Sequence, residues 1–309
     1  MENRVLVTGA SGFVGRTVVK ELLSQGALVL ALDQLQYNFN DSRVLFSKAN
    51  LLDKDTLSKD INAFKPTSVI HLAAIASPTY GNVGELYDIN VHGTENILDI
   101  LQEICEDGTR VVLASTAGVY GNSGKDYITE DTSFNPQNHY SFSKMITEYI
   151  SKSYLDKLDI KIIRPFNMIG VGQNESFLVP KLVKAFVYKQ PILSVGNIET
   201  YRDFVDIDFA SKIFCKVVLD KEMRENVLNI CAGYGTRGSD ILEMLQELTG
   251  YSPKIQVNPQ FLRKNEIMRL VGDPTKCNQF IGPNLQTKSV RNILEEMIRA
   301  YQKKVNSDE

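Results

Sequence analysis

The sequence has no tryptophan, and it has only three histidines and four cysteines in 309 residues. The cysteines are scattered without C-x-x-C spacing: Cys105, Cys215, Cys231 and Cys277. This pattern is typical of reduced, buried thiols in a cytoplasmic protein and argues against a disulfide scaffold. Because the histidines are also far apart in the sequence, we expect no metal site.

Long apolar runs and an excess of positive charge are also missing. No apolar run approaches the roughly 18 residues needed to cross a bilayer. The first predicted strand begins near residue 4, which leaves no room for a signal peptide. The net charge of −3 argues against nucleic acid or an anionic membrane as a partner. We therefore expect a cytoplasmic globular protein with a small-molecule ligand.

A glycine motif follows the first apolar run of the chain. Residues 5–15 read V-L-V-T-G-A-S-G-F-V-G. The apolar start predicts a strand buried on both faces, and apolar residues return at helical spacing after the glycines. Gly9, Gly12 and Gly15 thus lie between a strand and a helix, where glycine permits a tight turn and close approach of a pyrophosphate. The motif predicts a dinucleotide site.

Asp33 ends the next apolar run, about 20 residues beyond the glycines. A carboxylate at this place accepts hydrogen bonds from both ribose hydroxyls of NAD and repels a 2′-phosphate. Residues 34–40 contain no arginine or lysine that could hold such a phosphate. The sequence therefore favours NAD(H) as the cofactor, with NADP(H) left open as an alternative.

Tyr140 and Lys144 form the segment Y-S-F-S-K. Residues four apart on a helix share one face. An ammonium near a phenol favours the phenolate, so we expect the pKa of Tyr140 to lie below its free value of about 10. Such a tyrosine can exchange a proton with a sugar or alcohol oxygen. Taken alone, the spacing also fits two solvated helix residues, but the glycine motif favours catalysis.

The chain resembles the extended short-chain dehydrogenases/reductases that act on nucleotide sugars. The resemblance is carried by T-G-A-S-G-F-V-G at 8–15, H-L-A-A at 71–74, N-x-x-G-T at 90–94, S-T-x-x-V-Y-G at 115–121 and Y-x-x-x-K at 140–144. Segments 164–173, 196–208 and 263–276 are similar to the branch of GDP-mannose 4,6-dehydratases and GDP-4-keto-6-deoxy-mannose reductases. The dehydratases carry an acidic pair after the catalytic threonine. Here Ala117 and Gly118 stand in its place, which favours the reductases.

The resemblance implies a role for individual residues. The catalytic residues would be Thr116, Tyr140 and Lys144. The cofactor-binding residues would be Gly9, Gly12, Phe13, Val14, Gly15, Asp33, Asn50, Leu51, Leu72, Ala73, Ala74, Tyr140 and Lys144. The nucleotide sugar would contact Thr116, Asn167, Val179, Arg202, Arg263 and Glu266. Asn50 stands where the family usually has an aspartate that contacts adenine.

Strand and helix signals alternate as far as residue 165, which predicts a doubly wound parallel (Rossmann) α/β sheet. We expect strands near 4–8, 27–32, 44–49, 68–73, 110–115 and 160–164, and helices near 13–25, 54–63, 85–106 and 140–157. The NAD-binding domain would span 1–165 plus roughly 203–230. A smaller C-terminal α/β lobe for the substrate would comprise 166–200 and 231–309, with helices near 178–189, 238–249 and 289–304.

The resemblance implies NAD(P)H-dependent reduction of the C4 keto group of a nucleotide-linked 4-keto-6-deoxy sugar, with GDP as the nucleotide. An NAD-dependent nucleotide-sugar 4-epimerase with the same residues is the alternative, and Asp33 favours it. A regulatory protein that retains the fold is a third interpretation. The helices near 85–106 and 140–157 carry many apolar residues, and the family pairs them in a four-helix bundle, so we expect a homodimer.

Overall fold

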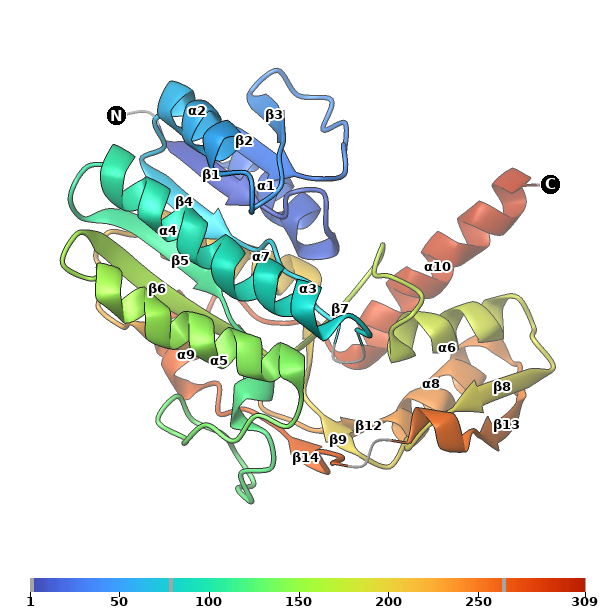
Figure 1. Ribbon diagram of the computed structural model, residues 1–309. Helices are drawn as coiled ribbons and strands as arrows, with labels where there is room; N and C mark the ends of the chain where they lie inside the picture. The colour runs from blue at the N-terminus through green and yellow to red at the C-terminus, as the bar shows by residue number, and fades with distance from the viewer. Residues whose placement is uncertain (1–2, 78–79, 263–264, 309) are drawn as a thin grey trace.

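The computed structural model describes residues 3–77, 80–262 and 265–308 (Figure 1). Seven strands form one parallel sheet in the order β11-β6-β5-β4-β1-β2-β3. The strands are β1 (Arg4–Thr8), β2 (Leu28–Asp33), β3 (Val44–Lys48), β4 (Ser68–His71), β5 (Thr109–Ala114), β6 (Leu158–Pro165) and β11 (Val227–Ile230). The predicted doubly wound Rossmann sheet is confirmed. Its order reverses between β1 and β4, which leaves a crevice at their carboxyl ends.

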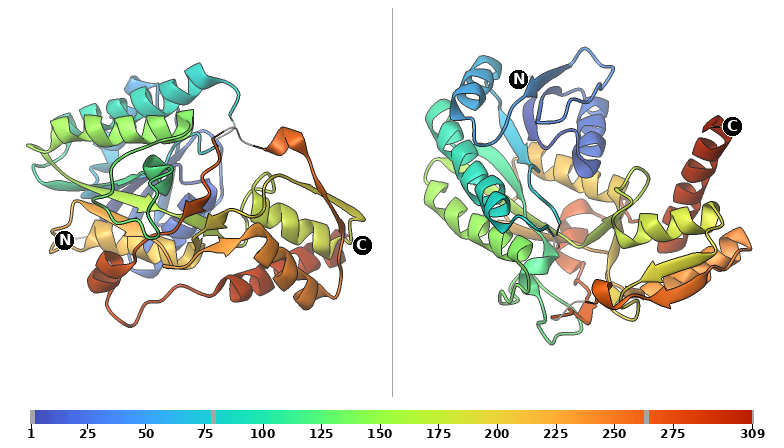
Figure 2. Two further views of the ribbon diagram at one scale, coloured as in Figure 1. Left: turned by 90° about the horizontal axis from the view of Figure 1, so that it is seen from below. Right: turned by 45° about the vertical axis from the view of Figure 1, so that its right-hand side comes forward.

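Both faces of the sheet are buried, which explains the unbroken apolar runs of its strands. In β1, Val5 and Val7 belong to one core, and Leu6 belongs to the core on the opposite face. One face is covered by α2 (Lys54–Phe64), α4 (Gly93–Ile104) and α5 (His139–Ser151), as Figures 1 and 2 show. The other is covered by α1 (Phe13–Ser24), α7 (Ile207–Leu219) and α9 (Thr275–Ile281).

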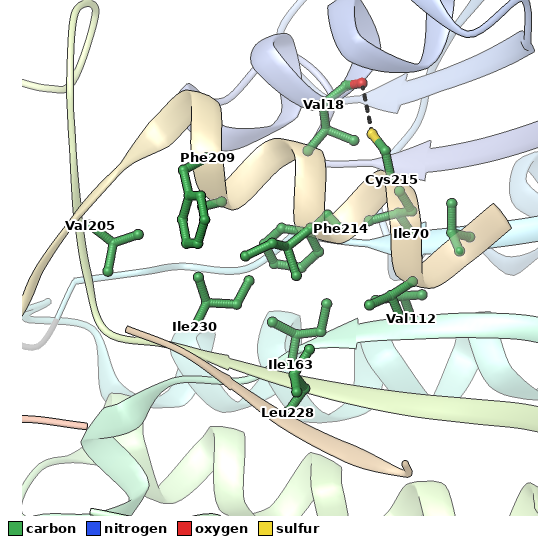
Figure 3. Close-up of a cluster of buried hydrophobic side chains, with 14 of the residues drawn as sticks. Val18, Ile70, Val112, Ile163, Val205, Phe209, Phe214, Cys215, Leu228 and Ile230 are labelled. Carbon is green, nitrogen blue, oxygen red and sulfur yellow. Dashed lines mark hydrogen bonds between the residues drawn. The ribbon is translucent and has the colours of Figure 1, made fainter. Parts of the chain in front are cut away.

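Helix α7 returns the chain to the sheet after the segment 166–206. Figure 3 shows Phe209 and Phe214 packed with side chains of β5, β6 and β11. The Cys215 thiol donates to the Val18 carbonyl oxygen at 3.6 Å and so connects α7 with α1. All four cysteines are buried and free, as predicted. The strand before α7, β10 (Phe204–Asp206), pairs with β7 (Asn167–Ile169) and not with the central sheet.

The second lobe has a core of its own. It contains α6 (Leu178–Val187), α8 (Gly238–Thr249), α10 (Val290–Asp308), β8 (Ile192–Val195) and β13 (Lys254–Val257). A small sheet of β12 (Thr236–Arg237), β9 (Tyr201–Arg202) and β14 (Arg269–Leu270) lies beside it. Short helical turns occur at η2 (Ala117–Tyr120), η3 (Lys152–Tyr154) and η4 (Pro259–Phe261). The division into two lobes stays a proposal. Helix α9 lies within 231–309, which was predicted for the second lobe, but it packs on the central sheet through Cys277.

Asp203 connects the small sheet with the end of the central sheet. Its buried carboxylate accepts hydrogen bonds from the N–H groups of Ala232 at 2.7 Å, Gly233 at 2.9 Å and Gly272 at 3.2 Å. Burial raises the pKa of Asp203 to about 6, although the three donors favour the charged form. Arg202, a predicted substrate residue, directly precedes this junction.

The helix expected over 85–106 has an internal interruption. It consists of α3 (Val83–Tyr87), a π-helical turn η1 (Asp88–His92) and α4. The turn lets the buried Asn90 accept from the Ile75 N–H at 2.7 Å and donate to the Ser143 hydroxyl at 2.9 Å. Several apolar side chains that suggested a dimer belong to the core of the sheet: Ile97, Leu98, Ile100, Leu101 and Tyr154.

None of the helices within the described ranges is long and apolar enough to cross a membrane.

Candidate active site

A cleft of about 730 Å³ opens where the strand order reverses, at the carboxyl ends of β1 and β4. Many predicted site residues line it: Gly9, Gly12, Phe13, Val14, Gly15, Asp33, Leu51, Leu72, Ala73, Ala74, Thr116, Tyr140, Lys144, Asn167 and Arg202. The lining comes from both the central sheet and the segment that leads into the second lobe. The cleft can therefore hold a dinucleotide next to a second ligand.

The glycine turn brings α1 directly onto the end of β1. Gly9 has φ +67°, and a Cβ there would lie 2.7 Å from the Ala73 backbone nitrogen. A Cβ on Gly15 would lie 2.1 Å from the Gly9 carbonyl oxygen, so only glycine fits. The N-cap residue of α1 is Gly12, which has no side chain to cap the helix. The N–H groups of the first turn are thus open to an anion such as a pyrophosphate.

Asp33 is held by the backbone at the opposite side of the turn. Its Oδ2 accepts from the Ser11 N–H at 3.0 Å, and its Oδ1 accepts from the Leu35 N–H at 3.0 Å. An ionised carboxylate has about four acceptor positions, so about two remain for ribose hydroxyls. Residues 9–15 and Asp33 together therefore fit NAD, with its pyrophosphate on α1 and a ribose at Asp33.

The three predicted catalytic residues meet at the end of β5. Asn138 caps α5 by accepting from the Ser141 N–H at 2.9 Å, and this start places Tyr140 and Lys144 in successive turns. Tyr140 is hydrogen bonded to the Thr116 side chain. Thr116 Oγ1 accepts from the Gly118 N–H at 3.1 Å, and Lys144 Nζ donates to the Ala114 carbonyl oxygen at 2.8 Å. A reacting oxygen in the cleft can reach both hydroxyl groups.

The expected fall in the pKa of Tyr140 is wrong. Burial raises the pKa of Tyr140 to about 12, although the hydrogen bond from Thr116 acts in the opposite direction. Burial also lowers the pKa of Lys144 to about 8, and the charge of Glu148 opposes that fall. Lys144 directs its ammonium to a carbonyl and not to the phenol, so desolvation decides the tyrosine's pKa. Tyr140 therefore keeps its proton at neutral pH.

His71 supports the floor of the cleft. Its Nδ1 is hydrogen bonded to Thr8 Oγ1 at 2.7 Å and its Nε2 to Thr94 Oγ1 at 3.0 Å. The Ala73 N–H donates to the same Thr8 hydroxyl at 3.2 Å. Burial lowers the pKa of His71 to about 3, and the positive charge of Lys144 adds to this effect. The imidazole is neutral and holds β1, β4 and α4 together.

The substrate end of the cleft agrees only in part with expectation. Arg202 lines the cleft, and its Nη2 lies 3.5 Å from Glu266 Oε1. Val179 does not line it, because this side chain packs inside the second lobe at 2% exposure. Asn50 does not line it either, because it is exposed and its Oδ1 accepts from the Leu52 N–H at 3.0 Å. Arg263 lies outside the described residues.

Several cleft residues escaped the sequence analysis. Ser11 and Asn138 contribute through hydrogen bonds that involve backbone N–H groups. Of the two, only Asn138 could be recognised in the sequence, from the Asn-x-x-Ser spacing of a helix N-cap. Gln173 lines the cleft and donates to the Met168 carbonyl oxygen at 3.0 Å. Its buried Oε1 accepts no hydrogen bond from any described residue. An unpaired buried acceptor is costly, so this atom is a candidate contact for a ligand hydroxyl.

Comparison with known proteins agrees with this geometry. The model of the NAD dependent epimerase/dehydratase family matches residues 5–231, which include the glycine turn and the catalytic trio. The chain belongs to this family. The family match confirms the expected NAD(H) cofactor. At the level of the family it also confirms the expected kind of enzyme, a relative of nucleotide-sugar epimerases and reductases.

Relatives within the epimerase/dehydratase family match along nearly the whole chain. A GDP-6-deoxy-D-talose 4-dehydrogenase from Aggregatibacter actinomycetemcomitans is 32% identical over 296 residues, covering 96% of this chain and 97% of the relative. A GDP-6-deoxy-D-mannose reductase from Pseudomonas aeruginosa is 27% identical, with coverage of 96% and 97%. The UDP-glucose 4-epimerase of Thermus thermophilus, crystallised with NAD, superposes with a TM-score of 0.84 at 26% identity, covering 97% of this chain and 99% of that one.

Proposed function

We propose that this protein reduces the C4 keto group of a nucleotide-linked 4-keto-6-deoxy sugar, with GDP as the nucleotide. The observation that carries the proposal is the meeting of Thr116, Tyr140 and Lys144 at a cleft that fits NAD. Two relatives, at 32% and 27% identity, are named as a dehydrogenase and a reductase of GDP-6-deoxy sugars.

The chemistry is a proton transfer coupled to a hydride transfer. Residues 9–15 and Asp33 would hold NADH, which would supply the hydride for C4 of the sugar. Tyr140 donates its proton to the carbonyl oxygen, and Thr116 donates a hydrogen bond to the same oxygen, so charge is stabilised as it develops. Lys144 adds a positive charge next to this position. One hydride and one proton convert the ketone to an alcohol, and the ionised Tyr140 is reprotonated from solvent.

The residues after Thr116 argue against elimination chemistry. Ala117 and Gly118 offer no carboxylate to remove the C6 hydroxyl. A Cβ on Gly118 would lie 2.5 Å from the Ser141 Oγ, so a side chain at this position would have to displace that hydroxyl. The small apolar surface suits the C6 methyl group of a 6-deoxy sugar.

The other end of the cleft suits a diphosphate. Arg202 carries a guanidinium, which binds phosphate oxygens through two donors at once. Asn167 lines the same cleft as this cation and the catalytic trio. We assign Glu266, whose carboxylate lies 3.5 Å from Arg202, to the nucleoside ribose. Arg263 completes the proposed set from its sequence motif.

An NAD-dependent 4-epimerase is the second candidate. The epimerase from Thermus thermophilus and the NAD-type carboxylate Asp33 favour it. An epimerase must first oxidise C4, and for this step Tyr140 must accept a proton. Burial raises the pKa of Tyr140 to about 12, so the phenol carries its proton at neutral pH, as the first step of a reduction requires.

An assay with purified protein separates the candidates. The protein is mixed with NADH and a GDP-4-keto-6-deoxy sugar. Loss of NADH absorbance in proportion to the sugar consumed supports the reductase. Interconversion of nucleotide sugars without net loss of NADH supports the epimerase. If neither GDP-4-keto-6-deoxy sugars nor other nucleotide sugars are turned over, the result supports the regulatory protein and contradicts both enzymes.

We further propose a homodimer formed through α4 and α5. Phe142 and Tyr149 on α5 are 40% and 53% exposed, which supports a contact there. The mass in solution, measured by light scattering, tests the proposal; a monomer at all concentrations contradicts it.

A further inference from the structure

Three successive turns of α5 are attached to three successive residues at the end of β5. The contacts are Tyr140 with Thr116, Lys144 with the Ala114 carbonyl and Glu148 with the Ser115 hydroxyl. The helix residues are spaced by four and share one face. The third contact has no part in the proposed chemistry, although it lies one helical turn from Lys144.

Glu148 is held firmly in a buried ion pair. It is 3% exposed, and its partner Arg164 on β6 is 4% exposed. Arg164 Nη2 donates to Glu148 Oε2 at 2.6 Å, and Nε donates to Oε1 at 3.0 Å. Arg164 Nη1 donates further to the Tyr120 hydroxyl at 2.8 Å. A buried pair of this kind contributes little net stability, so its retention suggests another purpose.

The charges around Lys144 are unevenly distributed. Tyr140 and Glu148 face it from its own helix, His71 faces it from β4, and Arg164 lies on β6 beyond Glu148. His71 and Tyr140 are neutral at pH 7, because burial takes their pKa values to about 3 and about 12. Glu148 is therefore the anion in this group, and its charge opposes the burial that lowers the pKa of Lys144 to about 8.

Ser115 connects Glu148 with the catalytic residue Thr116. Its hydroxyl donates to Glu148, and its N–H donates to the Ile163 carbonyl oxygen at 2.7 Å. The strand end is thus fixed by both α5 and β6. Thr116 is the next residue, so the position of its hydroxyl against Tyr140 depends on this attachment.

We propose that Glu148 is a positioning residue, which keeps Lys144 protonated and, through Ser115, holds Thr116 against Tyr140. The proposal rests on the catalytic roles given to Lys144 and Thr116 above. It adds a second requirement to the site: the helix must bring an anion as well as the tyrosine and the lysine.

Glu148→Gln tests the electrostatic part, because glutamine keeps the size and the acceptor for Ser115 but removes the charge. NADH binding is followed by fluorescence between about pH 6 and pH 9, together with kcat/KM over the same range. The pH at which NADH binding and kcat/KM fall on the basic side (the basic limb of each profile) should be about one unit lower than in the wild type. Asp159→Asn is the matched control: Asp159 pairs with Arg110 at 2.5 Å at the opposite end of β5 and β6. The control should leave both limbs unchanged.

A folded E148Q protein whose limbs match those of the wild type overturns the proposal. If E148Q does not fold, E148Q/R164M removes the unpaired charge as well; a shift in the same direction but of smaller size is expected, because the two charges of the pair act on Lys144 with opposite sign. Ser115→Ala tests the attachment of Thr116 and removes only a hydroxyl. It should lower kcat about tenfold with KM and the limbs unchanged, and a wild-type kcat overturns this part.

The outcomes separate this proposal from the proposed function. Inactivity of the wild-type protein on GDP-4-keto-6-deoxy sugars refutes the proposed substrate, while the pH dependence of NADH binding still reports on Lys144 without any sugar.

Discussion

The Tyr140 phenol and the Thr116 hydroxyl are hydrogen bonded to each other in the cleft, one from α5 and the other from the end of β5. The two hydroxyl groups are thus held side by side before any substrate arrives, and only the Thr116 proton must turn from the phenol to the substrate oxygen. Such preorganisation contributes to catalysis because the oxygen atoms of both groups are already in place.

Removal of the phenolic proton should stop the chemistry and spare binding. We expect Tyr140→Phe to lower kcat by about 100- to 10,000-fold, the usual contribution of a general acid. NADH affinity, measured by fluorescence, should stay near the wild-type value because the ring remains. Tyr149→Phe is the control, since Tyr149 lies on the same helix with its side chain 53% exposed. A Y140F enzyme with a near-normal rate would remove Tyr140 from the mechanism.

Asp33 should determine the choice of cofactor. Asp33→Asn keeps acceptors for the backbone but removes the charge that repels a 2′-phosphate. The ratio of kcat/KM with NADPH to that with NADH should rise about tenfold, or about 1.4 kcal/mol. Asp41→Asn removes a carboxylate from the same loop, where Asp41 pairs with Arg43 at 2.7 Å, and should leave the ratio unchanged. An unaltered ratio in D33N would mean that the ribose binds elsewhere.

Arg202 should act on affinity for the nucleotide more than on the chemical step. Arg202→Lys keeps the charge and loses the forked geometry that suits a diphosphate. KM for the nucleotide sugar should rise about tenfold while kcat changes little. Arg299→Lys makes the same exchange at an exposed position on α10 and should have no effect. A change in kcat alone would contradict the assignment.

The buried His71 should make the fold sensitive to acid. Its pKa is about 3 in the folded chain against about 6.5 when unfolded, so the unfolded chain binds the proton more readily. Its contribution to stability is therefore present above about pH 6.5 and is lost as the pH falls towards 3. Between about pH 7 and pH 4 the loss should be about 3 kcal/mol. Urea unfolding of the wild type and of His71→Gln measures it; equal slopes with pH would exclude His71 as the cause.

The central sheet was predictable because burial on both faces leaves a signal in each strand. Val5 to Val7 must all be apolar, whichever face they point to. Helix α9 was not predicted, because it is only seven residues long and its apolar contacts come from Cys277, Phe280 and Ile281. The π-helical turn was not predictable either: its residues include no glycine or proline, and Asn90 is held by partners 15 and 53 residues away.

The candidate site, like the fold, was predictable only in part. The sequence predicted which residues line the cleft wherever a strand end or a glycine turn determines their place. The pKa of Tyr140 was out of reach, because it depends on where the Lys144 ammonium points and on how far loops exclude water. Val179 was misplaced because helical spacing does not tell which face of α6 meets the core of its own lobe.

The junction at Asp203 fixes the backbone next to Arg202, which lines the cleft. Segments 29 and 69 residues away in the sequence are fastened there to one carboxylate. Arg202 directly precedes this carboxylate, so its backbone is held in place by donors from two other segments. A diphosphate bound at Arg202 would therefore meet a cation whose backbone is already fixed before the ligand arrives.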